Sequence, residues 1–248
     1  MDYRKRIYDA YVSKSLKYTG PIDNVRYEGS TKYFRRRFMP FLPQNKDARI
    51  LDLACGTGRF LYFLQKEGYS HALGIDISQE AVDLAERMGV KNIEVGDLFE
   101  MLPHRKEEFD FIFASEFIEH LRKDEVFEFL DLVYAALKPG GRTLMTTPNA
   151  ASLFGARAAF FDFTHETAFT PQSLAEVFRV CSFENVMVYG AEPVVRGLLS
   201  GVRAILWKPL KVVVKAYLLI DGSTGFGVWN RGDILSHGIF VVGSRLNG

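Results

Sequence analysis

Short apolar runs alternate along most of the chain with stretches in which apolar residues recur at helical spacing. The runs cover residues 50–54, 71–77, 93–95, 109–114 and 142–147, and each has the length of a buried strand. Between the first two runs, Phe60, Leu61 and Leu64 form one apolar helix face, and Gly68 ends that helix. Strands separated by single helices predict an α/β fold, with a mainly parallel sheet and helices on both faces.

The C-terminal third departs from this alternation. A loop-rich segment at 148–170 precedes a helix that begins near Pro171, and further strands are predicted at 183–189 and 238–243. An insertion separates these two strands in place of a standard crossover helix. The 248 residues therefore divide into an N-terminal helical cap (1–48), one core (49–190 and 237–248) and a basic amphipathic insertion (191–236).

Composition and charge exclude several classes of protein. The net charge of +1 gives no general attraction to nucleic acid, so we expect no nucleic-acid partner. Cys55 and Cys181 are the only cysteines, too few for a disulfide framework or a Cys-rich zinc site. The basic N-terminus lacks the apolar core of a secretory signal, and no apolar run reaches the roughly 18 residues of a membrane span. We therefore expect a cytoplasmic protein.

The most informative segment is the glycine-rich turn after the first strand, Leu51-Asp-Leu-Ala-Cys-Gly-Thr-Gly-Arg-Phe. Gly56 and Gly58 lack the β-carbons that would keep a ligand away from the backbone. The turn lies at the carboxyl edge of the sheet, where such folds bind nucleotides. Asp76 closes the second strand and can accept hydrogen bonds from a ribose diol. The pattern predicts a cofactor that contains a nucleoside.

Two cofactors fit this geometry, a nicotinamide dinucleotide and S-adenosylmethionine (SAM). The third glycine of the dinucleotide spacing is absent, because Leu61 stands where the helix would approach a pyrophosphate. Phe60 and Leu61 in the first helical turn suit a ligand without phosphate, which needs no anion site there. After the third strand, Asp97 can bind an adenine amino group and Leu98 can lie against the ring. These details favour SAM.

Five segments, in order, resemble those of the class I SAM-dependent methyltransferases. They are Leu51-Asp-Leu-Ala-Cys-Gly-Thr-Gly, Gly74-Ile-Asp-Ile-Ser, Gly96-Asp-Leu, Ala114-Ser-Glu-Phe-Ile-Glu-His-Leu and Leu137-Lys-Pro-Gly-Gly. The resemblance implies a Rossmann-like sheet of seven strands, mainly parallel, whose antiparallel seventh strand lies beside the fifth. It also implies SAM as the methyl donor and S-adenosylhomocysteine as the product.

The same resemblance assigns the cofactor site. It implies that Asp52 and the Gly56–Gly58 loop hold the amino acid moiety of SAM, Asp76 the ribose hydroxyls, and Asp97 with Leu98 the adenine. The remaining cofactor residues that we assign within the core are Ala54, Ile77, Ser115 and Phe117. Class I enzymes also close a helix over SAM before the first strand. We therefore add Tyr33 and Arg37 from the cap, with Arg37 pairing with the cofactor carboxylate.

Candidate catalytic side chains follow the fifth strand, in residues 161–170. A hydroxyl acceptor gains from a base that removes its proton as the new bond forms. His165 could be that base, with Asp162 orienting its imidazole, since histidine titrates nearest neutral pH. Alternatively, Asp162 and Thr164 cap a loop turn and His165 only packs.

A second polar group lies after the fourth strand. We expect Glu119 and His120 to order the loop and the helix that follows, in preference to a chemical role. Asp162, His165, Glu166 and Glu119 could also supply metal ligands. Metal-dependent catechol-type members carry an Asp-Asn pair around the fifth strand, however, whereas this chain reads Thr146-Thr-Pro-Asn149. We therefore expect no metal.

The segment from Asp162 to Thr170, followed by a helix and a long insertion, resembles a bacterial subgroup found among glycan-modifying enzymes. That resemblance implies a small-molecule acceptor, namely a sugar hydroxyl of a surface glycan or of a nucleotide-sugar or lipid-linked precursor. The segment from Ser115 to His120 is shared with O-methyltransferases of quinone precursors, which leaves a quinone precursor as an alternative acceptor. An NAD-dependent oxidoreductase and a non-catalytic SAM-binding protein are the alternatives from other classes.

The insertion contains a basic amphipathic stretch at residues 196–220. Its charged side chains are all cationic: Arg196, Arg203, Lys208, Lys211 and Lys215. Such a stretch suits an interfacial helix on anionic lipid, so we expect peripheral contact with the inner membrane surface; a lid or a dimer surface fits equally well. Pro209 should kink or split the helix. The glycine-rich residues 221–232 border the acceptor pocket or form a connector. The oligomeric state is left open.

Overall fold

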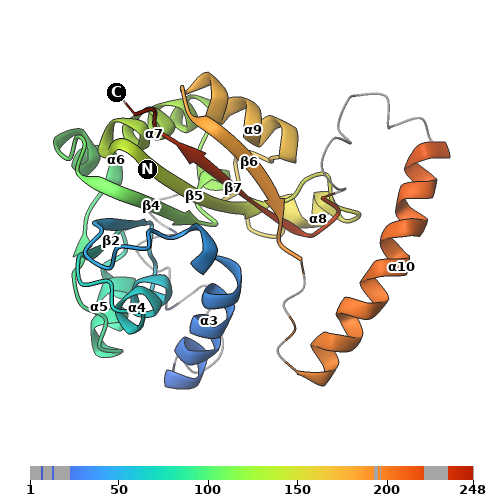
Figure 1. The fold of residues 1–248 in the computed structure, drawn as a ribbon, viewed down its shortest axis with the longest axis horizontal. Helices are drawn as coiled ribbons and strands as arrows, with labels where there is room; N and C mark the ends of the chain where they lie inside the picture. Colours follow the sequence, from blue (N-terminus) through green and yellow to red (C-terminus); the bar gives the residue numbers. More distant parts are fainter. Residues whose placement is uncertain are drawn as a thin grey trace.

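One seven-stranded sheet organises the molecule. The computed structural model describes Ile7, Ser13, residues 23–192, Val195, 197–220 and 234–247. Within these ranges the strand order is β3-β2-β1-β4-β5-β7-β6 (Figure 1). The strands are β1 (Ile50–Leu53), β2 (Ala72–Asp76), β3 (Ile93–Val95), β4 (Phe109–Ser115), β5 (Leu137–Pro148), β6 (Glu184–Gly190) and β7 (Gly238–Ser244). Only β7 runs antiparallel to its neighbours, β5 and β6. The predicted fold class, with the antiparallel strand beside the fifth, is confirmed.

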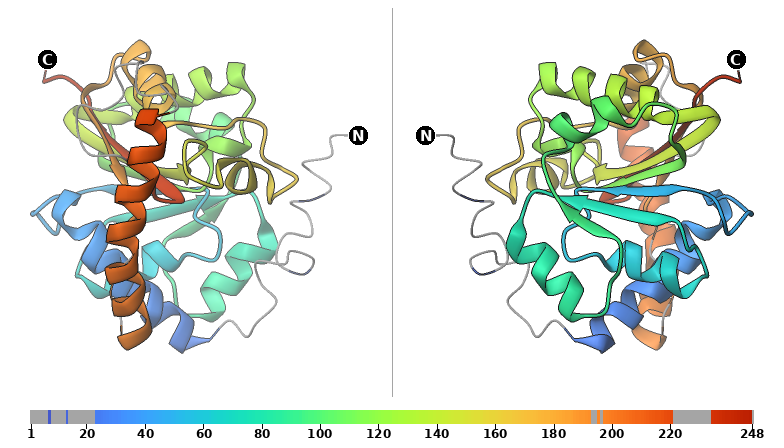
Figure 2. Two further views of the ribbon diagram at one scale, coloured as in Figure 1. Left: turned by 90° about the vertical axis from the view of Figure 1, so that its right-hand side faces the viewer. Right: turned by 90° about the vertical axis from the view of Figure 1, so that its left-hand side faces the viewer.

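Helices cover both faces of the sheet (Figures 1 and 2). One face carries α3 (Asn24–Arg37), α4 (Arg59–Lys66) and α5 (Gln79–Arg87), and the other carries α6 (Leu98–Met101), α7 (Lys123–Ala136) and α9 (Pro171–Val180). Shorter elements lie in the connections: η2 (Met39–Phe41), η3 (Leu102–His104), η4 (Ile118–His120) and α8 (Gly155–Phe160).

The alternation of side chains along each strand builds two apolar cores. On β1, Ile50 joins Phe111 and Phe113 beneath α3 and α4, whereas Leu51 and Leu53 join the core beneath α7 and α9. These residues are almost wholly buried, as expected for a parallel sheet with both faces covered. The two cores hold the carboxyl ends of β1, β2 and β4 at one common edge.

The junction of α7 and β5 differs from the predicted one. The sequence predicts a strand over residues 142–147, but β5 begins five residues earlier, at Leu137. Leu137 pairs with Phe109 and Arg142 with Phe111, so the residues between them bulge out of the ladder. The Gly140 N–H donates to the carbonyls of Arg245 and Leu246, which explains why the segment stays ordered as part of the strand.

The insertion contains α10 (Leu198–Ile220), which stands beside the main body in Figure 1. The helix continues through Pro209, so the predicted splitting of this helix is wrong. Proline has no backbone N–H and so removes one hydrogen bond from the helix. The helix nevertheless continues before and after Pro209. No helix in the described part of the chain has both the length and the hydropathy that a bilayer-spanning segment needs. Arg196 and the glycine-rich residues 221–232 lie outside the described residues.

Candidate cofactor and active site

The turn between β1 and α4 runs close to the neighbouring backbone. Ala54, Gly56 and Gly58 all have left-handed φ angles, of 49°, 55° and 70°. The Cys55 N–H donates to the Ile75 carbonyl at 3.0 Å, which ties the turn to β2. A β-carbon on Gly58 would lie 3.0 Å from Cγ1 of Val90, in addition to the strain of its φ angle. The backbone therefore favours glycine at both predicted positions, and Ala54 is the one residue of this turn that adopts the conformation with a side chain.

Asp76 joins the end of β2 to this turn. Its Oδ2 accepts a hydrogen bond from the Gly56 N–H at 2.6 Å, and its Oδ1 accepts from the Ser78 N–H at 2.8 Å. Burial raises the pKa of the Asp76 carboxyl, and these two hydrogen bonds act in the opposite direction. The carboxylate thus lies beside the glycine turn, as the sequence predicts, and it orders the turn directly.

Asp52 lies one strand away and is more deeply enclosed. Burial, and secondly the charge of Asp76, raise its pKa well above the usual value. Oδ2 of Asp52 has no hydrogen-bond partner within the described structure. Two carboxyl groups in a poorly solvated position favour a cationic ligand, because a nearby positive charge would stabilise their ionised forms.

The predicted adenine-binding residues Asp97 and Leu98 also have structural roles. Asp97 caps α6 by accepting a hydrogen bond from the Phe99 N–H at 2.8 Å, and Leu98 is buried in the core. Ile77 directly follows β2 and Val95 ends β3, with exposed fractions of 54% and 43%. These two side chains offer apolar surface at the edge where adenine is expected, and Val95 was not predicted.

Ser115 ends β4 and Phe117 lies two residues beyond it, and the two side chains make different contacts. The Ser115 hydroxyl lies 2.9 Å from Oγ1 of Thr146 on β5, which links the ends of the two strands. Phe117 packs edge-on against Phe129 of α7, with ring centroids 5.2 Å apart. Neither contact tests the predicted role at the cofactor.

The cap helix α3 contacts the glycine turn through a residue that the sequence analysis missed. The Tyr27 hydroxyl donates a short hydrogen bond to the carbonyl of Thr57, and the ring is fully buried. Tyr33 packs among aromatic rings, 5.7 Å from the Arg37 guanidinium. The Arg37 guanidinium donates to the carbonyls of Gly190 and Glu192, so its contacts are with the end of β6. This placement gives no support to Arg37 as the partner of a cofactor carboxylate.

The candidate base His165 lies in the loop after α8. Its Nδ1 is 2.7 Å from the Ala159 carbonyl. A carbonyl only accepts hydrogen bonds, so Nδ1 carries the proton and Nε2 is the basic nitrogen of the ring. The carbonyl of Ala159, in place of the predicted Asp162 carboxylate, holds Nδ1 of the imidazole.

Asp162 instead supports a neighbouring histidine. Its Oδ1 accepts from the Thr164 N–H at 3.0 Å and from the Thr164 hydroxyl at 2.7 Å. The same hydroxyl lies 2.7 Å from Nδ1 of His120. The loop-capping alternative for Asp162 and Thr164 therefore describes these contacts better than a direct pairing of Asp162 with His165. The sequence could not show this, because His120 is 44 residues away from Thr164.

Backbone hydrogen bonds fix this loop to η4. The N–H groups of Glu166 and Thr167 both donate to the carbonyl of Glu119, at 2.8 and 3.0 Å. The Thr167 hydroxyl donates to the carbonyl of Leu121 at 2.7 Å. His120 and His165 consequently lie edge to face with ring centroids 4.7 Å apart. The loops after β4 and β5 form one ordered polar unit at the carboxyl edge of the sheet.

A family model described as a methyltransferase domain matches residues 27–188, from Tyr27 to the last part of β6. The chain belongs to this family. The matched range includes the glycine turn, both carboxylates and the two histidines. The resemblance to class I methyltransferases, and SAM as the cofactor of that class, are thereby confirmed at the level of family and fold, whereas nothing here shows the glycan-modifying subgroup.

Known relatives of this methyltransferase domain act on diverse acceptors. The chain is 25% identical over 158 residues to a phosphoethanolamine N-methyltransferase of Plasmodium falciparum, covering 61% of this chain and 59% of that protein. It is 35% identical over 113 residues to a mitochondrial ubiquinone biosynthesis O-methyltransferase of Rattus norvegicus. This match covers 42% of this chain and 32% of that protein. The chain thus spans between a third and three fifths of the length of these two relatives.

A solved structure shows that the similarity in fold covers nearly the whole chain. A SAM-dependent methyltransferase from Archaeoglobus fulgidus superposes with a TM-score of 0.68 at 22% identity, covering 96% of this chain and all of that one. Similarity at this level establishes the fold. The acceptor, and the atom of the acceptor that receives the methyl group, must therefore be inferred from the residues of the site.

Proposed function

We propose that this methyltransferase moves the methyl group of SAM to a hydroxyl oxygen of a small acceptor, a sugar of a surface glycan or of its lipid-linked precursor. The observation that carries the proposal is the orientation of His165. With Nδ1 bonded to the Ala159 carbonyl, Nε2 is the nitrogen that can take a proton from the acceptor hydroxyl. The methyl carbon then leaves the sulfonium for the hydroxyl oxygen, the proton passes to His165, and S-adenosylhomocysteine remains.

The cofactor half of the site uses backbone and carboxylates. In the proposal, the turn around Gly56 and Gly58 receives the amino acid part of SAM, beside the buried Asp52. Asp76 exchanges its bond with the Gly56 N–H for bonds with the ribose hydroxyls. Ile77, Val95 and Asp97 border the adenine. Alignment of donor and acceptor is the main catalytic requirement, because the reaction is an in-line displacement.

An apolar surface near His165 supports an acceptor with a lipid part. Phe154, Phe160, Phe161 and Phe163, on α8 and beside it, are between 61% and 84% exposed. Exposed aromatic side chains in such number mark a binding surface. The ubiquinone relative keeps a quinone precursor as a second candidate, because a prenylated phenol also combines a hydroxyl with a long apolar tail.

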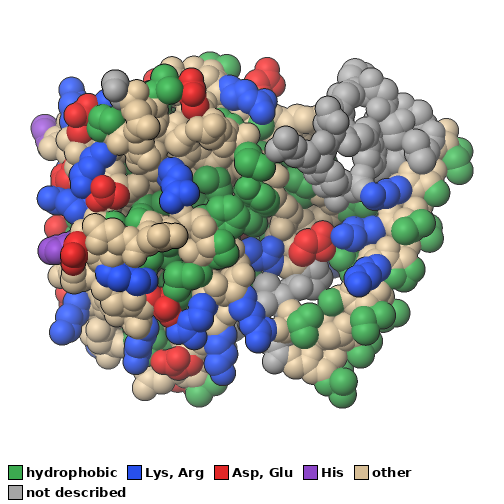
Figure 3. All heavy atoms as spheres, in the orientation of Figure 1, with side chains coloured by type: hydrophobic (Ala, Val, Ile, Leu, Met, Phe, Trp, Pro, Cys, Tyr) green, Lys and Arg blue, Asp and Glu red, His purple; other side chains and the backbone are tan. Residues whose placement is uncertain are grey.

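We further propose, from the surface of helix α10, that the reaction takes place at a membrane surface. Lys and Arg side chains line the side of the helix that faces the body, and apolar side chains line the outer side (Figure 3). Leu199, Ile205, Val212 and Val213 on α10 are each more than 60% exposed. In the proposal this outer face lies on anionic lipid at the cytoplasmic side of the inner membrane, with the cations near the headgroups.

The function is tested first by ligands and then by acceptors. SAM and S-adenosylhomocysteine should raise the melting temperature, whereas NAD should not, because only a ligand of the native state stabilises it. Incubation with labelled SAM and a panel of lipid-linked sugars, nucleotide sugars and prenylated phenols should label one class. Labelling of an amine in preference to every hydroxyl would overturn the O-methyltransferase assignment. Stabilisation by NAD alone would overturn the SAM-dependent function.

A further inference from the structure

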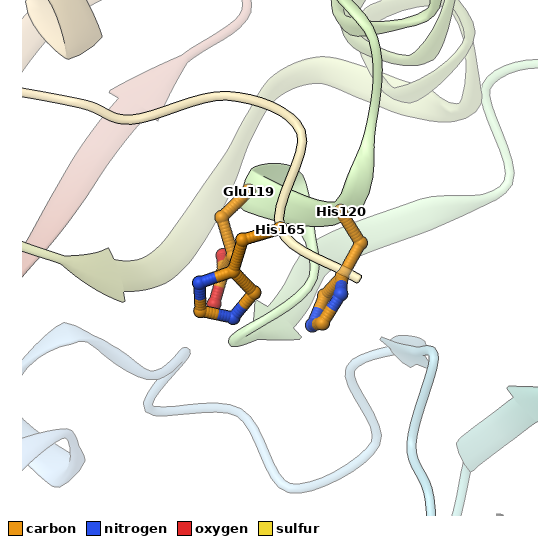
Figure 4. A group of neighbouring side chains, drawn as sticks. All are labelled: Glu119, His120 and His165. Carbon is orange, nitrogen blue, oxygen red and sulfur yellow. The ribbon is translucent and has the colours of Figure 1, made fainter. Parts of the chain in front are cut away.

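Glu119, His120 and His165 form a compact group outside the predicted pairing of His165 with Asp162. One potential ligand atom from each of the three lies within 4.8 Å of the other two. Glu119 and His120 are buried and His165 is half-buried. Figure 4 shows Glu119 and His120 coming from η4 and His165 from the loop, with all three side chains pointing the same way. The geometry points to a binding site for a divalent transition-metal ion.

The hydrogen bonds of both rings fix the tautomer that a metal requires. Nδ1 of His165 donates to the Ala159 carbonyl. Nδ1 of His120 lies near two oxygens of Thr164, its hydroxyl at 2.7 Å and its carbonyl at 3.3 Å, and the hydroxyl proton is directed to Asp162. Both rings therefore carry their proton on Nδ1 and present Nε2 as the ligand nitrogen. Orientation of one ring nitrogen by a carbonyl or a carboxylate-linked group is the usual arrangement behind metal-binding histidines.

The two ligand segments are also held together before any ion arrives. Hydrogen bonds from Glu166 and Thr167 to the Glu119 carbonyl place the loop against η4. A point equidistant from three atoms 4.8 Å apart lies about 2.8 Å from each, against roughly 2.0–2.2 Å for Zn–N and Zn–O bonds. Shifts of under ~1 Å in each side chain would therefore close the site.

The donor set selects the kind of ion. Two imidazoles and one carboxylate suit Fe²⁺, Co²⁺ or Zn²⁺, whereas Mg²⁺ and Ca²⁺ prefer oxygen ligands. Three protein ligands leave at least one position open, as in catalytic metal sites and unlike closed structural ones. The open position would take the acceptor oxygen, a use that rests on the proposed function.

A bound ion changes the role of His165. With an ion bound, Nε2 of His165 would be a ligand and would not take the proton that it receives in the metal-free reaction proposed above. The ion would instead lower the pKa of the coordinated hydroxyl, and its proton would pass to solvent water. The proposed site departs from the sequence interpretation, which names Glu119 and His165 among candidate ligands but expects no metal.

The test is direct metal binding by the protein after treatment with a chelator. Titration with Co²⁺ should give one equivalent bound, visible as d–d absorption, and Zn²⁺ should displace it while excess Mg²⁺ should not. Glu119→Gln and His165→Ala should each weaken Co²⁺ binding by at least tenfold. His237→Ala is the matched control, because His237 is an exposed histidine at β7 outside the group, and its affinity should equal that of the wild type.

Two outcomes would overturn the inference: no uptake of Co²⁺ by the wild-type protein, or one equivalent bound by His120→Ala/His165→Ala. Each variant is first shown to be folded by thermal unfolding. The shift in melting temperature caused by SAM is measured on the same chelated samples. If SAM raises the melting temperature but Co²⁺ is not bound, only the metal site is overturned. If Co²⁺ is bound but SAM does not raise the melting temperature, only the proposed function is overturned.

Discussion

The cofactor half and the acceptor half of the site are built in different ways. Around Gly56 and Asp76, backbone conformation and a carboxylate on the adjacent strand form the site, within 21 residues of sequence. Around His120 and His165, side chains 45 residues apart meet because backbone hydrogen bonds join two loops. Changes in the first half should alter cofactor affinity, and changes in the second should alter turnover while the cofactor still binds.

The largest effect is expected at His165. His165→Ala should lower kcat by about 100-fold or more, because either the base or a metal ligand is lost. The SAM dissociation constant, measured by calorimetry, should stay within about twofold of the wild type. Turnover at the wild-type rate in this variant would place the chemistry elsewhere, and His237→Ala serves as the unaffected control.

Gly58→Ala should cause the next largest effect, in the opposite half. The added methyl group meets Val90 and must adopt a φ angle of 70°, at a cost of about 2 kcal/mol. Thermal unfolding should show the loss of stability, and calorimetry should show weakened SAM binding. Gly68→Ala is the matched control, since Gly68 has a φ angle of 88° but nothing within 4 Å of the added carbon. Equal SAM affinity in Gly58→Ala and the wild type would contradict a role for the turn.

Asp52→Asn should raise the melting temperature of the protein, while it should not improve SAM binding. The raised pKa of Asp52 means that the folded state prefers the protonated carboxyl, so its stabilising contribution is present at low pH and is lost as the pH rises through the folded pKa. The uncharged amide avoids that loss. The melting temperature near neutral pH should therefore rise by about 2–4 °C, the shift that ~1 kcal/mol gives in a domain of this size.

The same carboxylates predict how cofactor affinity depends on pH. The sulfonium and ammonium of SAM favour ionised Asp52 and Asp76, whose pKa values are raised in the free protein. SAM should therefore bind more tightly as the pH rises through those values, and Asp52→Asn should flatten the profile. Calorimetry across acidic to neutral pH checks this, and an affinity that falls with rising pH would contradict it.

Thr164→Val should have the smallest effect. The variant keeps the side-chain shape but breaks the link from Asp162 to Nδ1 of His120. Because the link acts through a neighbour, kcat should fall by about tenfold with SAM affinity unchanged. Thr143→Val is the control, a buried threonine on β5 away from the histidines. A wild-type kcat in Thr164→Val would show that the link is not needed.

The two halves also differ in how far the sequence predicts them. The strands of the core, the glycine turn and the place of Asp76 at the end of β2 follow from local patterns, because strand length, turn residues and spacing act over short stretches. The position of the antiparallel β7 beside β5 was instead implied by the family resemblance. Contacts between distant loops cannot be predicted from local patterns. His165 was chosen from the sequence as the candidate base, a role that stays a prediction, and Nδ1 of its ring contacts the Ala159 carbonyl instead of Asp162. The position of His120 beside His165 is set by tertiary hydrogen bonds. Tyr27 was missed because a single tyrosine in the polar cap helix leaves no sequence signal of its contact with Thr57.

Calorimetric titration of S-adenosylhomocysteine into the wild-type protein tests the central claim most directly. One-site binding is predicted, abolished in Asp76→Ala and retained in His165→Ala. Absence of heat from the wild type, in a sample shown to be folded, would contradict the account, and so would equal binding by Asp76→Ala.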